Sequence, residues 1–285
     1  MDGIIVVRKE KKMTSHDVVN RLRRILKTKK VGHSGTLDPN VEGVLVVFVN
    51  KGCKAIQFME DTTKQYRGRL RMGIATDTED RDGAVTAQEP VSLPLDEAVL
   101  RAIMKNMIGK QKQIPPMVSA VKINGKKLYE YAREGIQVER KARDIELYDL
   151  QLGDIEQEYV SFTVDCSAGT YVRTLCVDIA KQYGSIAHMD ELVRTRVGTF
   201  TLEQSSTLKE IEEGHFTWIP ILEGLNGYPL QECPNIDDVK NGKKLTLDRE
   251  EPLVLLVHEN QAIAMYEKLE TTDAGTLYQC VRGLW

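Results

Sequence analysis

The chain of 285 residues has few cysteines and no long run of apolar residues. Its five cysteines lie far apart and form no C-x-x-C pair, which argues against a metal cluster or a disulfide framework and favours a reducing cytoplasm. No segment approaches the roughly 18 consecutive apolar residues of a membrane helix, and the first residues lack the basic and apolar pattern of a secretory signal. We therefore expect a cytoplasmic protein that does not enter a membrane.

A strong net charge is also absent, since the formal value is −3, but the charges are unevenly distributed. Residues 8–30 hold ten basic against two acidic side chains, and residues 122–143 hold seven against three. From residue 203 onward, fifteen acidic residues stand against seven basic ones. A basic run is more often a solvated face than a nucleic-acid footprint. Two such runs in one mildly basic body nevertheless favour RNA as the partner.

A glycine-rich loop presents a single carboxylate. Residues 32–43 read Gly-His-Ser-Gly-Thr-Leu-Asp-Pro-Asn-Val-Glu-Gly and precede the apolar run 44–49. Because Pro39 disfavours helix at Asp38, the carboxylate is predicted to lie on an exposed turn beside a buried strand. A rigid loop that carries one acid can present a catalytic group. A plain surface turn is the alternative that the local chemistry alone favours.

Hydrophobic periodicity predicts a mixed α+β fold. Alternating or continuous apolar residues predict strands, and apolar residues at helical spacing predict helices. The strands are expected at residues 3–7, 44–49, 64–72, 145–152 and 160–166, and the helices from Thr14 or Ser15 and over 95–107, 128–133 and 172–183. Along 64–72 the alternation places Tyr66 with the apolar residues, in a covered space.

Residues 77–89 are rich in acidic and turn-forming side chains. Their spacing approaches that of a calcium-binding loop, but Thr78 occupies the first ligand position and Pro90 stands where a helix should continue. We therefore predict a tight acidic turn rather than a calcium site.

Four sequence blocks resemble those of the TruB family of tRNA pseudouridine synthases. Residues 32–39 resemble the family's catalytic motif, and Lys64-Gln-Tyr-Arg67 resembles its K-x-Y motif. Gly169-Thr-Tyr-Val-Arg-Thr174 resembles its G-T-Y-[IV]-R segment, and residues 119–133 resemble a further signature. Because the blocks follow the family's order over residues 31–198, together they are far more specific than any one of them. One departure is Val193, where the family commonly has a basic residue.

The resemblance implies that the chain converts uridine to pseudouridine at position 55, in the TΨC loop of tRNA. This isomerisation breaks the N1–C1′ bond, rotates the uracil and joins C5 to C1′, so it needs no cofactor and no metal. Asp38 would be the catalytic carboxylate, acting as a nucleophile at C1′ or as a base at C2′. Arg173 would be the cation that holds this carboxylate. Tyr66 would stack on the uracil and assist removal of the C5 proton.

The resemblance also implies how the RNA is held. The target base must be flipped out of its stack, and His33 would fill the gap that it leaves. Tyr171 and Leu192 would line the base pocket, and Lys64 would support the site or touch phosphate. A thumb-like segment at about residues 115–145 would close over the RNA, with phosphate contacts from Lys122, Lys126, Lys127 and Arg133.

The fold implied by the resemblance is α+β, with two domains. A pseudouridine synthase catalytic domain, built on a mixed and largely antiparallel sheet, is expected over residues 1–223. The glycines and prolines of residues 224–234 predict a linker. Short strand candidates at 252–257, 262–266 and 277–281 then predict a small β-rich, PUA-like RNA-binding domain over 229–285.

Three alternatives accompany this prediction. A non-catalytic RNA chaperone could fold tRNA through the same cleft, alone or beside the enzyme activity. A small-molecule hydrolase with a carboxylate nucleophile would leave the basic thumb-like segment unexplained. Relatives that work with a guide RNA share the motifs, although the short tail and the lack of long basic extensions favour a stand-alone enzyme. The expected partner is the TΨC arm of tRNA, bound by a monomer with no obligate protein partner.

Overall fold

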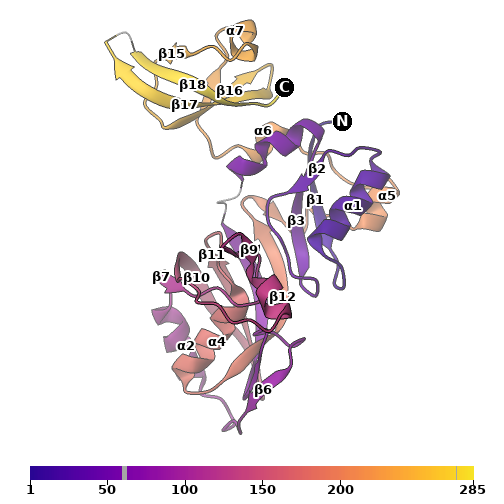
Figure 1. Cartoon of the computed structure of the whole chain (residues 1–285), viewed down its shortest axis with the longest axis vertical. Coiled ribbons are helices and arrows are strands. Elements are labelled where there is room, and N and C mark those ends of the chain that lie inside the picture. The colour runs from indigo at the N-terminus through magenta and orange to yellow at the C-terminus, as the bar shows by residue number, and fades with distance from the viewer. Residues whose placement is uncertain (60–62, 274) are drawn as a thin grey trace. The chain divides into compact units, whose positions relative to one another are not determined.

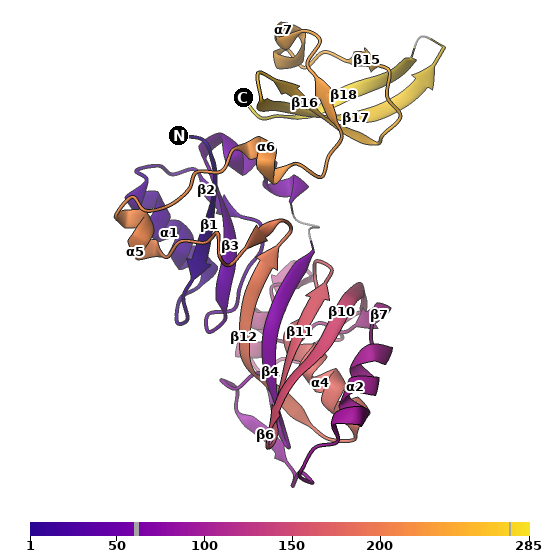
Figure 2. The same cartoon turned by 180° about the vertical axis from the view of Figure 1, so that it is seen from behind.

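The chain folds as two compact units in a computed structural model that describes residues 1–59, 63–273 and 275–285. The first unit comprises residues 1–61 and 199–285, and the second comprises residues 62–198. Figures 1 and 2 show the elements of both units from opposite sides. This division differs from the expected domains at 1–223 and 229–285, which remain a prediction.

The sheet of the first unit is centred on β3 (Glu42–Val49). β1 (Gly3–Lys9) lies antiparallel along one edge of β3, with Gly3 opposite Val49 and Lys9 opposite Gly43. β2 (Val31–His33) pairs antiparallel with the other edge. Every residue of β3 after Glu42 is buried, as its continuous apolar run predicts.

Helix α1 (Ser15–Ile25) covers this sheet. It begins at the expected cap, because Thr14 accepts the Asp17 N–H at 3.0 Å and the Asp17 carboxylate accepts the Thr14 N–H at 2.8 Å. Its buried face, Val18, Val19 and Leu22, belongs to one core with side chains of β1, β2 and β3. The sequence-predicted helix is therefore confirmed.

Residues after 198 complete the first unit. Ile219 exchanges both backbone hydrogen bonds with Ile4 of β1, each at 2.9 Å, and α5 (Leu208–Glu212) adds Leu208 and Ile211 to the α1 core. The other short elements here are η1 (Asn50–Phe58), β13 (Phe200–Thr201) and α6 (Ile221–Gly224).

A second sheet occupies the C-terminal part of the first unit. Its strand order is β14 (Leu230–Glu232), β16 (Leu253–His258), β17 (Gln261–Thr272), β18 (Gly275–Gly283) and β15 (Leu245–Leu247). Tyr266 and Tyr278 are fully buried in its core beside α7 (Ile236–Lys240). The predicted small β-rich part is confirmed, but residues 224–234 are not only a linker, because β14 pairs in parallel with β16.

The second unit is an antiparallel sheet with helices on one face (Figure 2). Its strand order is β12 (Ala187–Val197), β4 (Lys64–Met72), β11 (Tyr159–Cys166), β10 (Arg143–Glu156) and β7 (Gly109–Gln113). Helices α2 (Glu97–Asn106) and α4 (Val172–Tyr183) cover the sheet. The predicted α+β class with a largely antiparallel sheet is confirmed, whereas β7 and β12 of this sheet were not predicted from the sequence.

Two hairpins extend from this sheet. β5 (Ile74–Thr76) and β6 (Val85–Gln88) flank the acidic turn at residues 77–84. β8 (Lys122–Ile123) and β9 (Lys126–Lys127) precede α3 (Leu128–Arg133) in the thumb-like segment.

The cysteines form no disulfide within the described residues. Cys166, Cys176 and Cys233 are buried, as expected of small apolar side chains, whereas Cys53 and Cys280 are only half-buried.

Candidate active site

Asp38 lies in a turn of the first unit. The carbonyl oxygen of Asp38 accepts the Val41 N–H at 3.1 Å, and Pro39 follows Asp38 at the turn position that proline favours. Upstream, the Leu37 N–H donates to Ser15 Oγ at 2.9 Å, which ties the loop to the first residue of α1. The predicted turn is confirmed, but Asp38 is half-buried rather than fully exposed.

Lys9 holds the same turn from β1. Its side chain is fully buried, and its Nζ donates to three carbonyl oxygens: Glu10 at 2.9 Å, Met13 at 2.7 Å and Pro39 at 3.0 Å. An ammonium group is buried at an acceptable cost only when its donors are satisfied. Lys9 was not among the predicted site residues, because it stands in a basic run that is typical of a solvent-exposed face.

Two positions of the loop require glycine, one because of a close contact and one because of its backbone conformation. A Cβ on Gly32 would come within 2.7 Å of Ile56 Cδ1, and Gly43 adopts a φ of +119° where β3 begins. Between them, the ring Nδ1 of His33 accepts the Gly35 N–H at 3.2 Å. His33 is therefore oriented within the loop at the end of β2, half-buried.

In the second unit, β4 places Lys64 and Tyr66 on the covered face of the sheet. The side chains alternate as predicted, with Lys64 and Tyr66 only 7% and 8% exposed. Tyr66 lies between Val164 of β11 and Arg194 of β12 in the strand ladder. Arg194 is 2% exposed and was not among the predicted site residues.

Arg173 lies in the first turn of α4 and is 3% exposed. Its Nη1 donates to the Thr78 carbonyl at 2.9 Å and its Nη2 to the Val118 carbonyl at 2.8 Å. Its Nε lies 3.8 Å from Oδ2 of Asp80. The acidic turn and the segment around Val118 thus fix the planar guanidinium from different sides.

Gln113 contacts the segment that leads into α4. Gln113, at the end of β7, accepts the Tyr171 N–H at 2.8 Å and donates to the Tyr171 carbonyl at 3.1 Å. Tyr171 is the N-cap residue of α4, and Leu192 is 7% exposed on β12. Gln113 is 4% exposed and was also missed from the sequence.

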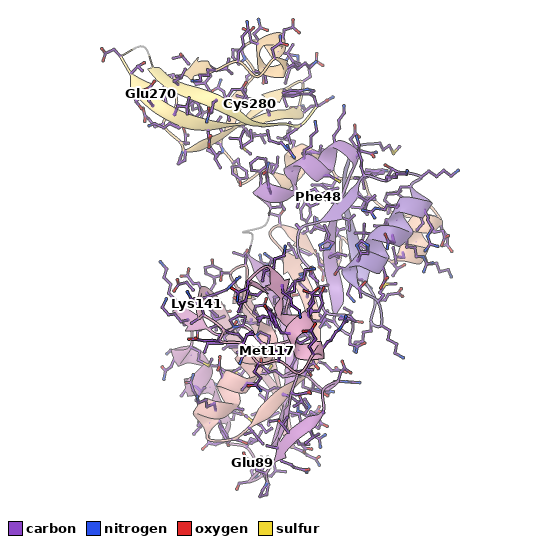
Figure 3. All side chains as sticks on the ribbon, in the orientation of Figure 1. Phe48, Glu89, Met117, Lys141, Glu270 and Cys280 are labelled. Atoms are coloured by element: carbon purple, nitrogen blue, oxygen red, sulfur yellow. The ribbon has the colours of Figure 1, made fainter. Side chains whose placement is uncertain are left out.

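Basic side chains lie beside tyrosine rings in the thumb-like segment, in which Figure 3 labels Met117 and Lys141. Lys126 lies 4.8 Å from the Tyr131 ring centre, and Lys127 and Arg133 each lie 5.3 Å from that of Tyr129. Lys122 and Arg133 are exposed. These cation–π contacts orient the basic groups while leaving them close to solvent.

The predicted site residues are divided between the two units. Asp38 and His33 belong to the first unit, and the second contains all the others: Lys64, Tyr66, Lys122, Lys126, Lys127, Arg133, Tyr171, Arg173 and Leu192. The first unit thus contributes the carboxylate of Asp38. The second contributes the fixed guanidinium of Arg173 and the buried side chain of Tyr66.

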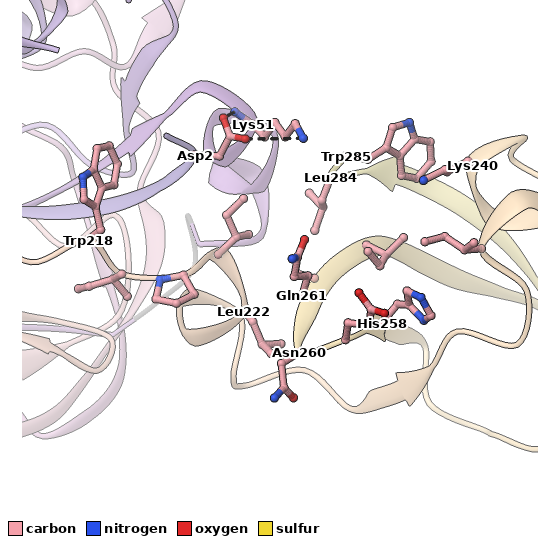
Figure 4. A pocket seen from close by; sticks show the side chains of 17 residues that line it. Asp2, Lys51, Trp218, Leu222, Lys240, His258, Asn260, Gln261, Leu284 and Trp285 are labelled. Atoms are coloured by element: carbon pink, nitrogen blue, oxygen red, sulfur yellow. Dashed lines mark hydrogen bonds and ion pairs between the residues drawn. The ribbon is translucent and has the colours of Figure 1, made fainter.

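None of these residues lines the pocket in Figure 4. That pocket has a volume of about 560 Å³ and lies in the first unit, between Trp218–Leu222 and the start of β17. Asp2 and Lys51 form a 3.6 Å ion pair at its edge.

Among the described residues, no cluster of His, Cys, Asp and Glu could hold a metal ion. No helix in the described part of the chain is long and apolar enough to span a membrane.

Comparison with known families gives two matches that together cover most of the chain. Residues 23–172 match the TruB family pseudouridylate synthase N-terminal domain, and residues 173–221 match the tRNA pseudouridylate synthase B C-terminal domain.

Curated relatives match over nearly the whole chain. The tRNA pseudouridine synthase B of Geobacillus thermodenitrificans (strain NG80-2) is 43% identical over 94% of this chain and 95% of its own length. That of Streptococcus sanguinis (strain SK36) is 43% identical over 95% of this chain and 97% of its own. Among solved structures, a chain of a Cbf5-Nop10-Gar1 complex matches with a TM-score of 0.77 at 25% identity, covering 99% of this chain and 85% of the other.

Proposed function

Because this chain belongs to the TruB family and is a tRNA pseudouridine synthase, we propose that it isomerises the uridine at position 55 of the TΨC loop with Asp38 as the catalytic carboxylate. The observation that carries the proposal is the construction of the Asp38 turn. Its proline-containing turn is tied to α1 through Ser15 and to β1 through the buried Lys9. Both nucleophilic and base catalysis require a carboxylate at a fixed position, and such a rigid turn provides one.

The proposed chemistry breaks the N1–C1′ bond and makes the C5–C1′ bond in its place. Asp38 either attacks C1′ or removes the C2′ proton, and both routes need a carboxylate that is ionised beside the ribose. Arg173 supplies the positive charge for that carboxylate in this proposal. Its guanidinium is already oriented by the Thr78 and Val118 carbonyls, so no reorganisation is needed when charge develops.

The remaining site residues recognise the flipped nucleotide. Tyr66 stacks on the uracil and assists loss of the C5 proton, while Tyr171 and Leu192 line the base pocket. His33 fills the space that the flipped uridine leaves in the RNA. Lys64 supports the covered side of the site.

The thumb-like segment supplies phosphate contacts. Lys122, Lys126, Lys127 and Arg133 bind the RNA backbone and contribute affinity for RNA rather than recognition of particular bases.

We extend the proposal to the domains and the assembly. Residues 1–223 form the catalytic domain, residues 229–285 form a small RNA-binding domain, and the monomer acts alone in the cytoplasm.

Release of tritium from tRNA labelled at uracil C5 tests the proposal. The parent should release label and the Asp38→Asn variant should not, while both bind tRNA with similar affinity. Asp154→Asn, at an exposed position of β10, is the matched control and should behave as the parent. Label release from Asp38→Asn at the parental rate would contradict the assigned role of Asp38.

The same variant tests a second role as an RNA chaperone. The pairing of cations with tyrosine rings in the thumb-like segment favours RNA binding that does not depend on Asp38. If Asp38→Asn accelerates the refolding of denatured tRNA as the parent does, the chain has both activities. Refolding without any label release from the parent would leave only the chaperone.

A further inference from the structure

Glu79 occupies an unusual position in the acidic turn of the β5–β6 hairpin. Its φ is +63°, a left-handed conformation that glycine, asparagine and aspartate tolerate better than glutamate. The backbone is nevertheless well anchored, because the Met189 N–H donates to the Glu79 carbonyl at 2.9 Å and the Arg81 N–H donates to the Met189 carbonyl at 2.9 Å. The turn is thereby docked on β12.

The two residues beside Glu79 both contact Arg173. The Thr78 carbonyl accepts from Nη1 of Arg173 at 2.9 Å, and the Asp80 carboxylate lies 3.8 Å from its Nε. The Glu79 side chain turns to the next residue of α4, where its Oε2 accepts the Thr174 hydroxyl at 2.6 Å. Three consecutive residues of the turn therefore bind two consecutive residues of α4.

This arrangement has an energetic cost that a plain turn would avoid. The positive φ is unfavourable for glutamate, and burial raises the pKa of its carboxyl group. The hydrogen bond from Thr174 and the positive charges of Arg173 and Arg140 lower this pKa and partly offset the effect of burial, whereas the negative charge of Asp80 raises it further. Asparagine or glycine at this position would relieve the backbone but could not bridge to Thr174 in the same way.

We propose that Glu79 is a positioning residue for the isomerisation: by accepting the Thr174 hydroxyl, it keeps the Thr78 carbonyl and the Asp80 carboxylate against Arg173, so that the guanidinium holds one orientation. This inference rests on the proposed role of Arg173. It assigns to Glu79 an effect on the chemical step and none on the affinity for tRNA.

Variants of Glu79 separate this role from simple stabilisation. Glu79→Gln keeps an acceptor for Thr174, Glu79→Ala removes it, and Glu79→Gly removes it while also relieving the backbone. Glu89→Ala is the matched control, because Glu89 accepts the Ser185 hydroxyl at 2.7 Å just beyond the other end of α4, away from Arg173. The measurements are the single-turnover rate at saturating tRNA, the Kd for tRNA and the melting temperature.

We expect Glu79→Ala and Glu79→Gly to lower the single-turnover rate by about tenfold or more without changing the Kd. Glu79→Gln should stay within about threefold of the parent, and Glu89→Ala should lose melting temperature but no rate. In a Thr174→Val background, Glu79→Ala should cause no further loss, because the shared hydrogen bond is already absent. A folded Glu79→Ala variant with the parental rate overturns the inference, as does a Gln variant as slow as Ala.

A crystal structure of Glu79→Ala provides a readout that does not depend on activity. Displacement of the Thr78 carbonyl or of Asp80 from Arg173 supports the inference, and retention of both interactions overturns it. Absence of tritium release from the parent would instead contradict the proposed function, so the two failures are distinguishable.

Discussion

The Nζ of Lys9 donates a hydrogen bond to the carbonyl oxygen of Pro39 at 3.0 Å, joining a buried side chain of β1 to the residue that follows Asp38. Lys9 and Pro39 are 30 positions apart in the chain. This hydrogen bond makes the orientation of the Asp38 turn depend on β1, an element of the sheet rather than of the loop. Substitutions at Lys9 should therefore affect both folding and catalysis.

Lys9→Met should lower the free energy of unfolding by about 2 kcal/mol, because three carbonyl acceptors lose their donor while the desolvation cost of the ammonium is relieved. The single-turnover rate should fall by about tenfold or more in the protein that remains folded, since the turn loses its tether. Urea unfolding and tritium release measure the two effects. Lys29→Met, at an exposed position, should change neither, and a stable Lys9→Met variant with the parental rate would show that the tether is unimportant.

Arg173→Lys should lower the single-turnover rate by about a hundredfold. A lysine retains the charge but cannot reach the Thr78 and Val118 carbonyls with a planar fork. Affinity for tRNA should stay within about twofold, because the phosphate contacts lie elsewhere. Arg101→Lys, at a surface ion pair with Glu97, is the control. An equal loss of affinity and rate would indicate that Arg173 acts mainly in RNA binding.

The sequence predicts β4 well and β12 not at all, for one physical reason. β4 alternates without interruption, so the covered positions of Tyr66 and Leu70 follow directly from its period of two. β12 carries register shifts between Met189 and Glu191 and between Arg194 and Arg196, and each bulge interrupts the alternation. A strand with charged residues and a broken period does not resemble a strand in sequence.

The candidate site was predictable only where a motif carries it. Asp38 and Arg173 stand in blocks that resemble a known family, and Tyr66 has both a motif and a clear period. Lys9 and Gln113 have neither, because their roles arise from hydrogen bonds with residues 30 and 58 positions away. Side chains that position the backbone of a distant loop give no local sequence pattern, and only the fold identifies them.

The pH dependence of stability should distinguish Glu79→Gln from the parent. Burial raises the pKa of Glu79 above its ordinary value of 4.5, so the folded state binds this proton more tightly than the unfolded state. The parent is therefore destabilised progressively as pH rises from about 4.5 through the folded pKa, and this effect is absent below that window. Glutamine does not titrate. Urea unfolding from pH 4 to 8 should show the stability of the variant improving relative to the parent, and a constant difference would contradict the raised pKa.

Neutralising the thumb-like segment should weaken tRNA binding without slowing the chemical step. Lys126→Ala and Lys127→Ala each remove a cation that lies over a tyrosine ring, and the double variant should bind tRNA about tenfold less tightly at 0.1 M salt. Its plot of log Kd against log salt should become shallower, by about 0.9 for each phosphate of a duplex that the protein no longer neutralises.

The single-turnover rate at saturating tRNA should remain at the parental value, because phosphate contacts position the RNA and do not touch the reacting ribose. Lys105→Ala and Lys181→Ala, at exposed positions of α2 and α4, test whether any loss of two lysines has the same effect. A parental salt dependence in the Lys126→Ala, Lys127→Ala protein would place the phosphate contacts elsewhere on the chain. A rate that fell even at saturation would instead mean that the segment helps to assemble the site around the flipped uridine.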